Sequence, residues 1–137
     1  MLFPKKRKYR RDFRGKIKGT AQRGTELSFG EFGLKSLGSG WITARQIEAA
    51  RRAITHCTKR SGKLWVRVFP DKPVVARPAG TRMGHGKGPV SHYVVPVRPG
   101  RILFELGGLE ESTARDALER ASHKLPIKTR IVSTNVI

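Results

Sequence analysis

The chain has 137 residues, with 29 Lys or Arg against 10 Asp or Glu, so its formal net charge at pH 7 is +19. This length suits one domain with an appended tail, and so strong a charge on so small a protein predicts a polyanionic partner. No apolar run reaches the ~20 residues of a membrane span, and we expect no signal peptide. The single cysteine excludes an internal disulfide and a multi-cysteine zinc site.

The charge is distributed unevenly along the chain. Residues 1–24 carry ten basic residues and one acid, and residues 35–101 carry fourteen basic residues and two acids. Residues 25–34 carry two acids and no basic residue, whereas residues 102–137 carry five of each sign. This asymmetry predicts a polyanion-binding surface on one side of the molecule.

The basic residues of segment 1–24 repel one another, and the segment is too polar to fold alone. Binding to phosphates would release counterions and order this tail, and its aromatic rings could stack on bases. A mitochondrial presequence is the alternative, but the tail is poor in serine and densely charged. We predict that the tail binds nucleic acid through Lys5, Lys6, Arg7, Lys8, Tyr9, Arg10, Arg11, Arg14, Lys16 and Lys18.

After the tail, the alternation over 26–29 predicts a strand with a bulge or hairpin near Gly30 and Gly33, and residues 38–40 predict a break. Thr43 and Gln46 form a capping box that opens a helix ending at 61–62. The helix has an apolar stripe that ends at Cys57, which fits a small buried hydrophobe better than a nucleophile. Its cationic residues could follow a phosphate backbone; they are Arg45, Arg51, Arg52, Lys59 and Arg60.

The second half of the chain predicts more strands and one more helix. A strand is expected over 63–69, a short extended piece over 74–76, and a hairpin over 91–97 and 101–106 with its turn at 98–100. An alanine-rich helix then ends before Pro126, and a last strand covers 129–133. We therefore predict an α+β domain over 25–137, with two helices packed on an antiparallel or mixed sheet.

The loop over 80–88 has four glycines and several cations, but it carries no nucleotide-binding motif. Gly88 follows Lys87 where a P-loop requires Ser or Thr, and the loop lacks the strand–loop–helix context of a dinucleotide site. The four histidines lie in different predicted elements, and carboxylates are scarce where cations are dense. We expect no metal, no cofactor, no small-molecule substrate and no enzymatic activity.

Several segments of the chain occur in the order and spacing of a known family. They are MLFPKKRKYRRDFRGK, ITARQIEAARRA, KLWVRVFPDKP, TRMGHGKG, PGRILFELGG and KLPIKTRIV. On these segments the chain resembles the universal large-subunit ribosomal protein L-sixteen / L-ten-e family, in its bacterial or organellar branch, from Met1 to about Val132. The resemblance implies an α+β fold with a β-hammerhead-like element.

The resemblance also implies a function. It indicates a non-catalytic constituent of the large ribosomal subunit, in the cytoplasm or an organelle, that binds large-subunit rRNA and neighbouring ribosomal proteins. It further implies contact with A-site tRNA, with P-site tRNA as a second candidate, through a loop directed toward the peptidyl-transferase region. Arg82, Met83, Gly84, Lys87 and Gly88 match this family loop, and His85 stands where lysine or serine is common. Arg45, Arg51 and Arg52 match the family's basic helix motif, and Arg23 is assigned no base contact.

Two other classes of function remain as alternatives. A histone-like DNA-binding protein would explain the charge but not the glycine-rich loop. An RNA-modifying or RNA-cleaving enzyme would require catalytic turnover, for which no set of side chains in the sequence is suited.

Overall fold

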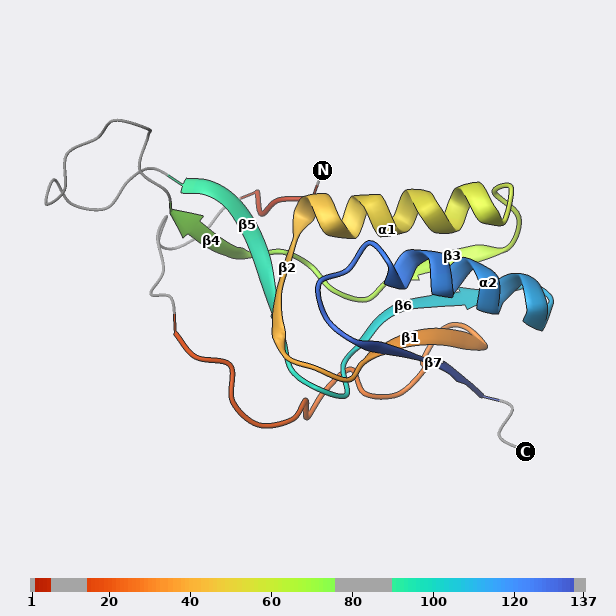
Figure 1. Cartoon of the computed structure of the whole chain (residues 1–137), viewed down its shortest axis with the longest axis horizontal. Coiled ribbons are helices and arrows are strands. Elements are labelled where there is room, and N and C mark those ends of the chain that lie inside the picture. The colour runs from red at the N-terminus through yellow and green to blue at the C-terminus, as the bar shows by residue number, and fades with distance from the viewer. Residues whose placement is uncertain (1, 6–14, 76–89, 135–137) are drawn as a thin grey trace, which may run out of the picture.

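The computed structural model describes residues 2–5, 15–75 and 90–134 of the chain. Within these residues two helices and seven strands make up an α+β fold, as the sequence predicts (Figure 1). In chain order the elements are β1 (Phe32–Ser36), β2 (Gly40–Thr43), α1 (Ala44–Cys57), β3 (Lys63–Val66), β4 (Lys72–Val75), β5 (Val90–Val97), β6 (Ile102–Gly107), α2 (Glu111–Ser122) and β7 (Thr129–Ser133).

The strands form two antiparallel sheets in the described part of the chain. The larger sheet has the order β3-β6-β1-β7, and the smaller has the order β2-β5-β4. Helix α2 packs on β1 and β7, helix α1 packs against β2 and β5, and the two helices pack on each other (Figure 1). The helix pair therefore joins the two sheets around one apolar core, in which β6 is buried along its whole length.

Helix α1 begins and packs as its sequence predicts. The Thr43 hydroxyl accepts a hydrogen bond from the Gln46 amide at 3.1 Å, and the Gln46 side chain accepts from the Thr43 amide at 2.9 Å, which completes the capping box. Ile47, Ala50 and Ile54 are buried, because positions three and four apart share one face of a helix. The apolar stripe thus fixes which side of α1 faces solvent.

The predicted hairpin over 91–106 is wrong, although both of its strands exist. β5 pairs with β2 and β4, whereas β6 pairs with β1 and β3. At the turn the chain passes from one sheet to the other around the buried Ser36 hydroxyl, which donates to the Arg98 carbonyl at 2.8 Å and accepts from the Arg101 amide at 3.1 Å. Gly100, at φ +99°, provides a backbone conformation that L side chains rarely adopt.

Two further expectations need correction near the start of the fold. Residues 26–29 are not a strand, because the amides of Ser28 and Phe29 donate to the Glu105 carboxylate instead of to a neighbouring strand. The break predicted over 38–40 is shorter than expected, because Gly40 already begins β2 and lies opposite Val97 in β5. Both corrections come from partners that are distant in sequence.

Candidate nucleic-acid interface

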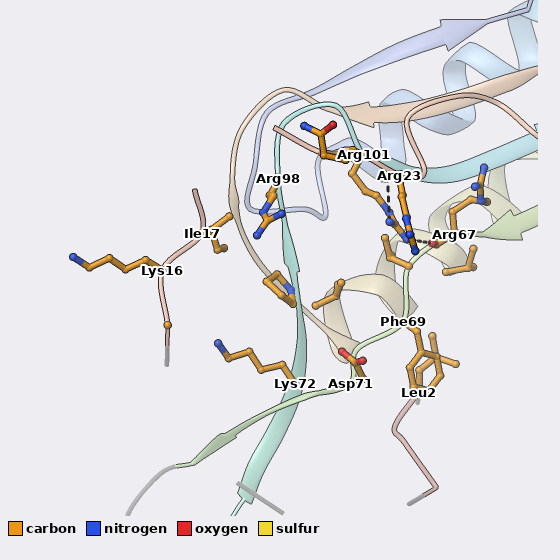
Figure 2. A pocket seen from close by; sticks show the side chains of 17 residues that line it. Leu2, Lys16, Ile17, Arg23, Arg67, Phe69, Asp71, Lys72, Arg98 and Arg101 are labelled. Carbon is orange, nitrogen blue, oxygen red and sulfur yellow. Dashed lines mark hydrogen bonds between the residues drawn. The ribbon is translucent and has the colours of Figure 1, made fainter. Parts of the chain in front are cut away.

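A hollow of about 840 Å³ opens where the two sheets meet, and residues 15–23 pass along one side of it (Figure 2). Apart from Leu2, the residues of its walls come from three regions that are distant in sequence: the end of the tail, the connection between β3 and β4, and the chain from the end of β5 to Arg101. The fold brings these regions together because residues 21–24 hydrogen-bond to the corner between β5 and β6. The Ala21 amide donates to the Pro99 carbonyl at 2.9 Å, and the Ile102 amide donates to the Gly24 carbonyl at 2.7 Å.

Cations dominate the charged part of this hollow's lining. Asp71 is the one acidic residue among the described residues that line it, and the apolar part of the wall includes Phe69 and Val95. Such a surface offers charge for phosphates and apolar area for bases or riboses. The lining cations are Lys16, Arg23, Arg67, Lys72, Arg98 and Arg101.

Two of these cations also hold the wall in place. The Arg101 guanidinium donates to the Arg67 carbonyl at 3.0 Å and to the Arg23 carbonyl at 3.4 Å, as the dashed lines in Figure 2 show. A Cβ on Gly24, at φ +67°, would lie only 2.9 Å from the Arg101 guanidinium, so glycine allows the tail to pass this close. The Lys72 ammonium lies 5.1 Å from the centre of the Trp41 ring, within cation–π range.

Arg67 forms an ion pair with Glu105, whose side chain is fully buried. Burial acts to raise the pKa of the Glu105 carboxyl, but hydrogen bonds from the Gly30 and Phe29 amides, from the Arg67 guanidinium and from the Ser28 amide outweigh it and hold the pKa below its ordinary value. Glu105 is therefore ionised at neutral pH, and it neutralises Arg67 from the interior.

A second hollow, of about 660 Å³, lies at the amino end of α1. Leu2 lines both hollows, and Phe3 lies with Arg45 and Tyr93 in the second one. The structure therefore brings the first residues of the tail to the amino end of α1. Lys5, Lys16, Lys18 and Arg45, all predicted site residues, are exposed to solvent.

The middle of α1 carries cations that share one acid. Glu48 forms ion pairs with Arg51 and with Arg52, the latter at 3.2 Å. The hydrogen bond from Arg51 is the main cause that lowers the pKa of Glu48 to about 2. Helix α1 carries three arginines but only one glutamate, so it keeps a surplus of positive charge.

Lys59 and Arg60 follow the end of α1 in an unusual conformation. Both have positive φ, 53° and 63°, a region that non-glycine residues seldom occupy, and both side chains are exposed. Because an α-helix rises ~1.5 Å per residue, the 14 residues of α1 place these cations about 20 Å from Arg45. They lie outside both hollows.

Cys57 is the last residue of α1, and its side chain reaches Asp116 of α2 and is partly buried against the core. Burial raises the pKa of the Cys57 thiol, and the hydrogen bond it donates to the Asp116 carboxylate, at 3.2 Å, raises it further. A protonated thiol of this kind is a poor nucleophile. In the part of the chain that the structure describes, no three His, Cys, Asp or Glu side chains gather as a metal site would require, and no helix is long and apolar enough to cross a membrane.

Sequence reasoning found part of this surface and missed part. Lys6–Arg11, Arg14 and the loop residues Arg82, Met83, Gly84, His85 and Lys87 lie outside the described residues. Arg67, Lys72, Arg98 and Arg101 were not predicted as site residues, because only the fold shows that their segments meet. The dense positive charge of residues 35–101 was the one signal in the sequence that pointed to them.

The fold and the cation-lined hollow define a small basic α+β protein. The family model described as ribosomal protein L16p/L10e matches residues 4–132, nearly the whole chain. The chain belongs to the ribosomal protein L16p/L10e family. It is therefore a structural protein of the large ribosomal subunit, in the cytoplasm, and the family is not a class of enzymes.

Proposed function

We propose that the tail, the cation-lined hollow and the outer face of α1 form one surface that binds large-subunit rRNA. The observation that carries this proposal is the lining of the hollow, where six cations stand with a single acid among the described residues. RNA that is folded exposes phosphates and 2′-hydroxyl groups, and such contacts read shape more than sequence. Of the six cations, Lys16, Arg23 and Arg98 are exposed to solvent, which suits that kind of recognition.

The positions of the elements support one continuous surface. Leu2 lines both hollows, and Lys16 lines the hollow at the junction of the sheets. Lys5, Lys16 and Lys18 are exposed to solvent. A polyanion that spans the two hollows would meet cations from the tail, from α1 and from the β5–β6 corner.

Competition between two polyanions tests this proposal against a general, histone-like DNA-binding function. The full chain is bound to a structured fragment of large-subunit rRNA, and unlabelled rRNA or duplex DNA of equal length is added as competitor. We expect rRNA to displace the complex at a much lower concentration than DNA, because the two nucleic acids differ in shape and in the 2′-hydroxyl. Equal competition by the two would contradict specific rRNA binding.

We also propose that the chain helps to shape the A-site region and contacts tRNA through its glycine-rich loop. Residues 76–89, which carry this loop, join the ends of β4 and β5, and these two strands extend away from the helix pair (Figure 1). Glycines leave room for close backbone approach, and Arg82 and Lys87 supply charge for tRNA phosphates. Exposed faces of the domain remain for neighbouring ribosomal proteins.

Exchange of Arg82 and Lys87 for Ala tests the role of the loop. We expect the doubly substituted chain to enter the large subunit normally and to slow accommodation of aminoacyl-tRNA, measured on purified subunits with fluorescent tRNA. Equal loss of subunit incorporation and of accommodation would mean that the loop has an architectural role only.

A further inference from the structure

Phe29 is an exposed aromatic residue whose ring is contacted by two neighbouring side chains. About 60% of its surface is open to solvent. Its ring stacks on Trp65, with ring centres 5.9 Å apart and planes inclined by 19°, and the Arg67 guanidinium carbon lies 5.2 Å from its centre. Trp65 and Arg67 therefore cover part of the Phe29 ring, and the part that stays open to solvent is called its outer face here.

A buried carboxylate fixes the backbone that carries this ring. One oxygen of Glu105 accepts hydrogen bonds from three successive amides, those of Ser28, Phe29 and Gly30, at 2.9, 3.0 and 3.0 Å. The other oxygen accepts from Arg67, which also donates to the Glu26 carbonyl at 3.2 Å. A Cβ on Gly30 would collide with the Leu106 carbonyl oxygen, so the loop lies directly on β6.

Stability of the fold alone does not account for this arrangement. An exposed phenylalanine contributes little burial of apolar surface, and a buried carboxylate carries a desolvation cost that a well-packed apolar side chain would avoid. What the arrangement achieves is a fixed position for an aromatic ring on the surface. Such preorganisation lowers the entropic cost of binding a ligand at that ring.

The ring lies next to the proposed rRNA surface. Arg67 contacts the Phe29 ring, and both Arg67 and Phe69 line the cation-rich hollow. The two acids near Phe29, Glu26 and Glu31, disfavour a phosphate at this position. A neutral, planar group is not repelled by the two acids. If it is attached to a phosphate backbone, that backbone can lie in the cation-lined hollow close by.

We propose that the outer face of Phe29 stacks on an unpaired base of the rRNA, while phosphates of the same strand lie in the hollow. This assignment rests on the proposed rRNA-binding function and adds a specific base-binding position to it. Arg67 and Trp65 contact the ring, and Glu105 fixes the backbone that carries it. Stacking on an aromatic side chain accepts any base, so the position selects an unpaired base and not a particular sequence.

Affinity for a large-subunit rRNA fragment, measured at several salt concentrations, tests the proposal. We expect Phe29→Ala to weaken binding roughly 5- to 150-fold, Phe29→Leu to weaken it nearly as much, and Phe29→Trp to stay within about two-fold of the original chain. The dependence of log affinity on log salt should keep its slope in all three, because stacking releases no counterions. Leu37→Ala is the matched control, since Leu37 is an exposed apolar residue outside both hollows.

The possible outcomes separate this proposal from the function on which it rests. If the original chain binds the rRNA and Phe29→Ala binds equally well, base stacking is overturned and rRNA binding stands. If affinity follows the thermal stability of the variants and not the presence of a ring, the proposal is also overturned. If the original chain shows no binding, the rRNA-binding function itself fails.

Discussion

Helices α1 and α2 contribute to the same core, but their solvent faces differ in how charge is arranged. On α2 each arginine has its own carboxylate one turn away: Arg115 lies 2.9 Å from Glu111, and Arg120 lies 3.5 Å from Asp116. On α1, by contrast, Arg51 and Arg52 share Glu48, and Arg45 is exposed. A cation with its own neighbouring acid contributes little long-range attraction, so the two helices differ in their expected partners although they have the same role in folding.

The inner and outer faces of each helix therefore have different roles. The buried stripes of both helices are alanine- and aliphatic-rich, and they determine how the helices pack. The outer faces determine which surface attracts a polyanion and which is electrically neutral. Of the three predictions below, the first concerns the tail, the second tests the distinction between the helices directly, and the third concerns the internal partner of a cation in the hollow.

The largest effect is expected for the basic run at the start of the tail. Replacement of Lys5, Lys6, Arg7 and Lys8 by Ala should lower the slope of log affinity against log salt for rRNA by ~3 to 4, because each phosphate contact releases about one counterion. Filter binding over a salt series measures this slope. An unchanged slope would show that this stretch does not contact phosphate, and the cationic side would then begin at the hollow.

A matched pair of triple variants compares the two helices directly. Arg45→Ala, Arg52→Ala and Lys59→Ala together should lower the same slope by roughly 2 to 3. The control removes three cations from the other helix and its end, with Arg115→Ala, Arg120→Ala and Lys124→Ala, and it should leave the slope unchanged. Equal losses in the two variants would mean that total charge, and not its placement, governs rRNA binding.

The smallest expected effect is a change in folding stability, and it comes from the buried Glu105 carboxylate that pairs with Arg67. Glu105→Gln keeps the shape of the side chain but removes the charge, and it should destabilise the protein by about 2 kcal/mol, the order expected for hydrogen bonds to a charged group. Because folding lowers the pKa of Glu105, its contribution to stability is fully present above the unfolded-state pKa of about 4.3 and is lost as pH falls through the lower folded-state pKa.

Urea unfolding as a function of pH measures this contribution. The difference in unfolding free energy between the original chain and Glu105→Gln should be constant near neutral pH and should shrink as the solution becomes strongly acidic. A difference that stays constant throughout the acid range would show that the effect does not come from ionisation of Glu105.

The parts of the fold that could be predicted from the sequence depend on local patterns. The capping box at Thr43 and the apolar spacing in both helices involve neighbours three or four residues apart, and the structure confirms them. Contacts between distant segments could not be predicted in this way. The split of 91–106 between two sheets depends on Ser36, and the irregular loop at Phe29 depends on Glu105, 76 residues later.

The same limit applies to the candidate site. The tail and α1 are local concentrations of positive charge, so the sequence predicts them as binding segments. Lys72 and Arg98 are single cations in strand-rich sequence, and only the general positive charge of residues 35–101 points to them. They become part of one only because the tail and the β5–β6 corner meet at the junction of the sheets.

The position of β1 has a consequence for synthesis of the chain. β1 is complete at Ser36, yet its two partners, β6 and β7, end at Gly107 and Ser133. Neither edge of β1 can find its hydrogen-bonding partner until most of the chain has left the ribosome that makes it, and such non-local pairing is intrinsically slow. During this interval the basic tail is already outside. The nascent chain would therefore present a strong polycation well before its fold can close, so early contact with RNA and completion of the larger sheet are separate steps in time.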